Sequence, residues 1–103
     1  MLRKLFIFII PFILFSCASN VDESEVKQAR QFFESIFQDR VIDSPEFQAS
    51  LGYKSNYDQW DDITWQHSRK KAKQAISDLA YLKENFDYSK LDESTKISYR
   101  LME

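Results

Sequence analysis

The sequence predicts an all-α fold of three to four helices that follow a signal peptide. After residue 22, apolar side chains recur at the three- and four-residue spacing of amphipathic helices. The 103 residues include one Gly and two Pro, too few for the turns of a small all-β domain. The formal charge of −2 lacks the basic excess of a nucleic-acid-binding domain, so no nucleic-acid partner is expected.

Residues 1–16 have the organisation of a secretory signal peptide. Arg3 and Lys4 form a positive start, and an apolar segment occupies residues 5–15. A helix of that length rises about 16 Å, roughly half of a ~30 Å hydrocarbon core. The segment is therefore predicted to direct export and not to span a membrane. Its removal would change the formal charge from −2 to −4.

The signal peptide leads into Leu-Phe-Ser-Cys at residues 14–17, which is similar to a bacterial lipobox. Phe15 departs from that motif, because a smaller residue is commoner there. The Cys17 thiol is predicted to receive a diacylglycerol, after which the signal peptidase would cut before this residue. Acylation of the new amine, for example with palmitate, would give stable anchoring. The lipid would hold the protein in the bacterial cell envelope, on the periplasmic or surface side of a membrane. The alternative is an ordinary secretory signal that is cleaved near Ala18 or Asn20.

Residues 17–22 are expected to be a tether, and residues 23–103 a helical segment. The first helix should begin after Asp22, because residues 22–25 have the form of a capping box. Its apolar stripe, which needs a hydrophobic partner, comprises Val26, Ala29, Phe32, Phe33, Ile36, Phe37 and Val41.

Two more helices are predicted beyond this one. Ser44 and Pro45 begin a short helix over 45–51, and Gly52 is placed to end it with a positive φ. Residues 53–64 lack a sustained period and are predicted to be an ordered loop. Thr64 caps a long helix over residues 65–86. Its buried stripe is expected to contain Trp65, Ala72, Ala75, Ile76, Leu79, Leu82 and Phe86.

A final helix opens after Asp92 and carries Ile97, Leu101 and Met102 on its apolar side. No Gly ends it before residue 103. The chain has too few residues to cover the wide apolar faces of its predicted helices. The sequence therefore predicts an incomplete piece of a larger helical domain.

From about Arg30 onward, the order of features resembles a bacterial family catalogued as domain of unknown function 885. The matching segments are Phe32-Phe33-Glu34, Ser44-Pro45-Glu46-Phe47, Leu51-Gly52, Tyr57-Asp58-Gln59-Trp60-Asp61-Asp62, Leu79-Ala80-Tyr81-Leu82 and residues 91–99. Full members of that family are several times longer, mostly helical, often lipoproteins, and look like zinc metallopeptidases. The resemblance implies that this chain corresponds to the N-terminal scaffold of such a protein.

The metallopeptidase motif His-Glu-x-x-His places two His side chains one helical turn apart to bind the metal. The chain has one His, so no catalytic residue is carried over and no metal site is predicted. The resemblance implies zinc only for the longer relatives. This chain alone is not expected to be an enzyme.

Tyr57, Trp60, Asp61 and Asp62 form the most notable patch of the predicted loop. Aromatic rings beside paired carboxylates can line a carbohydrate or peptide cleft. The favoured interpretation is structural, with the Trp packed beneath the helices and the Asp residues capping the next helix. A calcium site is disfavoured because the spacing lacks alternating oxygen ligands.

His67 has no ligand residue at metal-binding spacing and is expected to be exposed or to act as a cap. The basic run over residues 69–73 is interpreted as a solvated helix face, since Ala72 and Ile76 mark the buried side. Attraction to anionic lipid headgroups is the alternative.

A rival hypothesis is a complete small helical lipoprotein that acts as a protein-interaction module. Its docking face would be Phe32, Phe33, Ile36 and Phe37. Large exposed apolar patches usually mark interfaces. The two hypotheses differ in what covers this stripe: a missing C-terminal part of the same domain, or another molecule.

Overall fold

The computed structural model describes residues 20–103, and every regular element there is helical. This confirms the all-α prediction. The elements are α1 (Glu23–Asp43), α2 (Pro45–Ser50), α3 (Trp65–Asn85), the short 3-10 helix η1 (Tyr88–Lys90) and α4 (Glu93–Met102). The predicted signal peptide and Cys17 lie outside the described residues.

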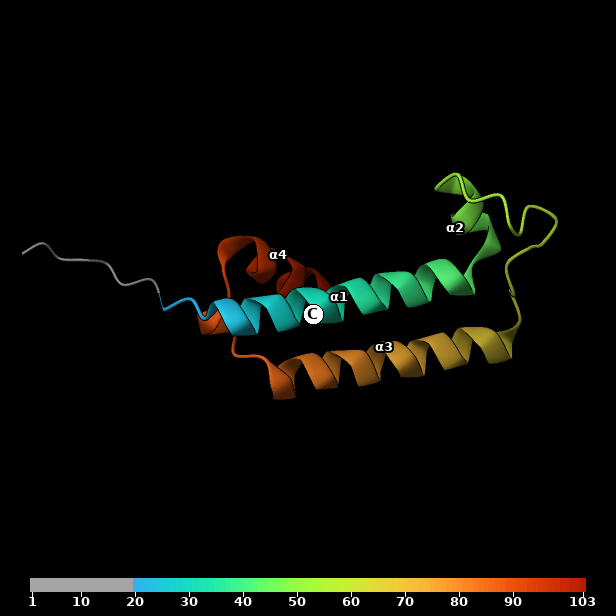
Figure 1. The fold of residues 1–103 in the computed structure, drawn as a ribbon. Helices are drawn as coiled ribbons and strands as arrows, with labels where there is room; N and C mark the ends of the chain where they lie inside the picture. The colour runs from blue at the N-terminus through green and yellow to red at the C-terminus, as the bar shows by residue number, and fades with distance from the viewer. Residues whose placement is uncertain (1–19) are drawn as a thin grey trace, which may run out of the picture.

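The two long helices, α1 and α3, run antiparallel side by side (Figure 1). The Phe32 ring of α1 lies 4.9 Å from the Tyr81 ring near the end of α3. At the other end, Asp43 contacts His67 in the first turn of α3. The chain therefore forms a long helical hairpin. Helix α4 packs on the N-terminal part of α1, and α2 lies at the far end of the hairpin, beside the loop that leads to α3.

The predicted helix starts are confirmed by their caps. In each case a side-chain oxygen accepts a backbone N–H from the first turn, which satisfies a donor that has no intrahelical partner. The caps are Asp22 for α1, Ser44 for α2, Thr64 for α3 and Asp92 for α4. Gly52 follows α2 with a φ of 87°, as predicted.

The capping box at α1 is only half formed. Asp22 Oδ1 accepts the N–H groups of Ser24 and Glu25 at 3.0 and 3.3 Å. The Glu25 carboxylate does not return to the Asp22 N–H; it accepts the N–H of Asp87. The Asp22 N–H donates instead to the Lys90 carbonyl at 2.8 Å. The start of α1 is thus held by the segment between α3 and α4, and the folded body begins inside the predicted tether.

The core lies where α1 begins, α3 ends and α4 packs. Its buried side chains come from all three helices and from the segment before α4: Val26, Ala29, Leu82, Phe86, Leu91 and Tyr99. Val21, Phe32, Phe33, Leu79, Tyr88 and Met102 pack around them. The core therefore occupies one end of the hairpin.

The predicted buried stripe of α3 is wrong in its N-terminal half. Leu79, Leu82 and Phe86 contribute to the core, but Trp65 and Ile76 are 73% and 71% exposed. Ala72 is also exposed, and so is Ala75, which lines the groove between α1 and α3. For Trp65, Ala72 and Ile76 the reason is that α1 meets the opposite side of this half of α3, where it pairs with His67 and Lys71.

The predicted apolar side of α4 is wrong for two of its three residues. Met102 packs on the core as predicted, but Ile97 and Leu101 are exposed, and Thr95 and Tyr99 are buried instead. Arg30 of α1 explains this rotation. Its guanidinium donates to Thr95 Oγ1 at 3.1 Å and to Ser94 Oγ at 3.0 Å, and it pairs with the Asp92 carboxylate. These bonds turn the first turn of α4 toward α1.

The apolar stripe of α1 is largely covered by the chain itself. Phe32 and Phe33 pack against the core, and Ile36 is half-buried. Phe37 is more exposed and meets Phe47 of α2 edge-on, with 6.0 Å between ring centroids. The docking face of the rival hypothesis is therefore smaller than the sequence predicts.

Candidate functional site

The four loop residues that the sequence singles out do not form one cleft. Tyr57 and Trp60 are exposed, Trp60 by 84%. The structural interpretation, in which Trp60 packs beneath the helices, is therefore wrong. Asp61 and Asp62 are engaged at two different helix starts and are not aimed at the two aromatic rings.

Asp61 supports the start of α2. Its carboxylate accepts the Ser44 hydroxyl at 2.6 Å and the Glu46 N–H at 3.0 Å. The Ser44 oxygen in turn accepts the Phe47 N–H at 3.0 Å. These hydrogen bonds, from Ser44 first and then from Glu46, lower the pKa of Asp61. The prediction that this Asp caps the next helix is wrong, because it secures the preceding one.

Asp62 lies at the start of α3. Its carboxylate accepts the Thr64 N–H at 2.9 Å, and hydrogen bonding to Thr64 lowers its pKa. This agrees with the capping role that the sequence predicts. The second Asp62 oxygen lies 3.7 Å from His67 Nδ1.

His67 joins α3 to α1. Its Nε2 lies 2.9 Å from Asp43 Oδ2, and the Lys71 Nζ lies 3.2 Å from the same oxygen. Burial acts to raise the pKa of Asp43, but the hydrogen bonds from His67 and Lys71 lower it below its ordinary value. The expectation of an exposed or capping His is wrong. The pairing escapes sequence reasoning because 24 residues separate Asp43 from His67.

A groove runs between α1 and α3 on the core side of this cluster. It has a volume of about 560 Å³. Ile36 and Ala75 supply apolar surface, and charged or amide side chains supply the rest: Asp39, Arg40, Asp43, His67, Lys70, Lys71, Gln74 and Asp78. The mixture of both signs of charge provides no single cradle for an anion or a cation.

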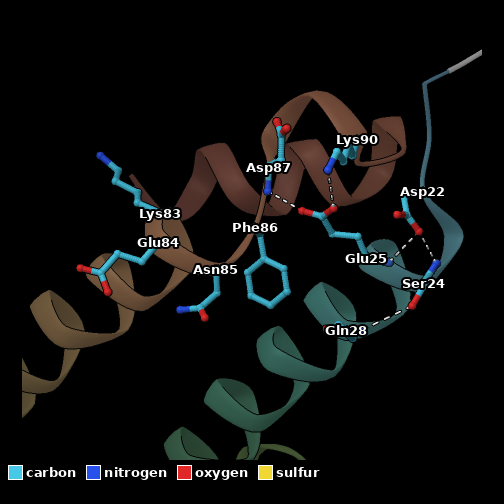
Figure 2. A pocket seen from close by; sticks show the side chains of 10 residues that line it. All are labelled: Asp22, Ser24, Glu25, Gln28, Lys83, Glu84, Asn85, Phe86, Asp87 and Lys90. Atoms are coloured by element: carbon cyan, nitrogen blue, oxygen red, sulfur yellow. Dashed lines mark hydrogen bonds and ion pairs between the residues drawn. The ribbon is translucent and has the colours of Figure 1, made fainter.

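A second cavity, of about 510 Å³, lies at the opposite end of the hairpin (Figure 2). Its polar groups largely bind one another. The Glu25 carboxylate accepts the Asp87 N–H and lies 3.8 Å from Lys90 Nζ. Phe86 points toward α1, as Figure 2 shows, and closes the core beneath. We interpret this cavity as the joint between α1 and the α3–α4 connection.

Within residues 20–103, no three His, Cys, Asp or Glu side chains are grouped closely enough to hold a metal ion. None of the helices there has the length and apolar character needed to cross a bilayer.

Comparison with known proteins gives no relative: no family model, no curated protein and no solved structure matches the chain.

Proposed function

We propose that the chain is a membrane-anchored bacterial lipoprotein whose helical body acts as a scaffold. The observation that carries the proposal is the leader that ends in Leu-Phe-Ser-Cys at residues 14–17. The position of the folded body supports it. Val21, only a few positions after the lipid site at Cys17, already packs against the core. A lipid there would hold the body close to a membrane.

The scaffold role is supported by how the candidate side chains are used. Asp61 secures α2, Asp62 the start of α3, and His67 the contact between α3 and α1. Each of these side chains is engaged in a contact that holds the fold together. This pattern is compatible with the N-terminal scaffold of the metallopeptidase-like family that the sequence resembles, in which the chain itself would supply no catalytic residue and zinc would belong to other parts of the relatives.

The test is the intact mass of the native protein extracted from its host's membranes, for wild type and for Cys17→Ser. Wild type should start at Cys17 and carry acyl chains, whereas the variant should lack them. Because acylation takes place at the Cys17 thiol and amine, an Asn20→Ser variant serves as the control and should remain acylated. A wild-type N-terminus without lipid would refute the lipoprotein proposal.

A second candidate function is a protein-interaction module, which the groove between α1 and α3 favours. Ile36, one of the residues of the predicted docking face, lines this groove together with Ala75. A partner that binds there should protect the amide of Ala75 from hydrogen exchange. The same intact-mass experiment also separates the scaffold from the interaction module. A chain several times heavier than 12.3 kDa favours the scaffold of a larger protein.

A further inference from the structure

The side of α3 that is turned away from α1 combines exposed apolar and cationic side chains. At about 100° per residue, its members between Trp65 and Ile76 fall within a sector roughly 100° wide, opposite His67. Ile63, just before the helix, is 91% exposed. We name this surface the lateral face and define it as Ile63, Trp65, Arg69, Ala72, Lys73 and Ile76.

The cations of the lateral face are available for a ligand. Within residues 20–103, Lys71 pairs with Asp43 and Lys83 with Glu103, but neither Arg69 nor Lys73 forms an ion pair. They border a surface hollow of about 610 Å³ that is lined by Gln66, Arg69, Lys70, Lys73, Gln74 and Ser77. These side chains supply hydrogen-bond donors and positive charge on a chain whose formal charge is −2.

We propose that the lateral face lies on an anionic phospholipid surface. Trp65 and Ile76 would enter the boundary between headgroups and acyl chains, where Trp side chains concentrate. Arg69 and Lys73 would contact lipid phosphates, as the cationic residues of helices that lie in the plane of an interface do. The sequence-based interpretation of residues 69–73 as a solvated face assumes that Ala72 and Ile76 mark the buried side of the helix. Both are exposed, so that interpretation loses its basis.

The composition of the face favours lipid over a protein partner. Lys is depleted from protein interfaces relative to the rest of a protein surface. At about 100° per residue, Arg69 and Lys73 lie beside the apolar side chains, about 20° and 60° around the axis from Ile76, as cations do on helices that lie in a membrane interface. At a bilayer this arrangement is stable, because the Lys stem lies along apolar surface while its ammonium reaches the headgroups.

The proposal goes beyond a lipid anchor and does not require one. An anchor at Cys17 would attach the end of the body where α1 begins. The lateral face would determine how the body is oriented, with the axis of α3 along the membrane. Because α3 is about 30 Å long, the face can meet several headgroups at once.

The chain contains two Trp residues, at positions 60 and 65, so its fluorescence reports on this region directly. We would place the full chain, as Trp60→Phe, in vesicles of phosphatidylcholine alone and in vesicles with an equal part of phosphatidylglycerol. Only the anionic vesicles should shift the Trp65 emission to shorter wavelength and allow quenching by brominated acyl chains. High salt should reverse the effect.

Charge reversal separates specific docking from the general attraction of the chain. Each cation lost should lower the docking equilibrium about fivefold. Lys73→Glu should therefore reduce quenching strongly. Lys27→Glu is the matched control, since Lys27 is exposed on α1, about 150° around the axis from the residues that face α3. It should leave quenching unchanged.

Three outcomes would overturn the proposal. Trp65 emission could be equal in the two kinds of vesicle, or Lys27→Glu could reduce quenching as much as Lys73→Glu does. A shift that grows with protein concentration in the absence of vesicles would indicate self-association through this face. If quenching persists in a Cys17→Ser background while acylation is lost, the lateral face binds the vesicles independently of the lipid anchor.

Discussion

Leu82 and Ile76 lie on the same helix, and helical periodicity predicts that both are buried. The structure separates them: Leu82 is fully buried, whereas Ile76 is mostly exposed. Leu82→Ala removes three buried carbons, about 2.4 kcal/mol of transfer free energy. The cavity left among Val26, Ala29 and Phe86 raises the expected loss to about 3–4 kcal/mol.

Ile76→Ala removes the same number of carbons from a largely solvated site. The buried part is worth about 0.7 kcal/mol, and the higher helix propensity of Ala returns about 0.4 kcal/mol. The free energy of unfolding should therefore change by less than about 0.5 kcal/mol. This variant is the matched control for Leu82→Ala.

Urea denaturation followed by far-ultraviolet circular dichroism, without lipid, would measure both changes. A loss of about 3 kcal/mol should also lower Tm by at least about 12 °C in a body of this size. Equal losses for the two variants would refute the reasoning, because they would mean that the outer side of α3 is packed. A loss below about 1 kcal/mol for Leu82→Ala would show that the core does not lie at this end.

Acid should weaken the far end of the hairpin, because the folded-state pKa of Asp43 is lowered. Such a group stabilises the fold above its ordinary pKa, and the contribution is lost as pH falls through the lowered value. Asp43→Asn should therefore destabilise the protein at neutral pH but not at low pH. The control, Asp58→Asn, should have little effect on stability at either pH. A loss of stability in Asp43→Asn that does not depend on pH would contradict this reasoning. Gly52→Ala should lower the free energy of unfolding by about 1 kcal/mol in the same urea denaturation. The loss comes from the φ of 87°, which residues with a Cβ rarely adopt; no clash adds to it, because no atom lies near the added Cβ. A loss near zero would show that the backbone leaves this conformation easily.

Local signals account for what the sequence predicts correctly. Asp22, Ser44, Thr64 and Asp92 act on N–H groups two or three residues away, so the sequence contains both partners. The same is true of the turn at Gly52. The helix boundaries could therefore be predicted from the sequence.

Long-range choices account for what it predicts wrongly. Periodicity identifies the apolar side of α4, but it does not show that Arg30 would turn Thr95 inward. Likewise, the Glu25 carboxylate has two possible N–H partners, and the one it takes lies 62 residues away. Of the candidate site, the sequence identifies the capping role of Asp62, whose partner is two residues away, but not the partners of Asp61, because these depend on how the helices meet.

The junction that holds the start of α1 also affects when the protein can fold. Val26 and Ala29 are made early, but their partners Leu82, Phe86, Leu91 and Tyr99 are made last. Loop closure over some sixty residues must precede any contact between α1 and the rest of the core, which costs entropy and slows folding. The core therefore stays incomplete until about residue 99 has been synthesised. Such a delay would suit the export that we propose, because a folded body would not pass through a secretion channel.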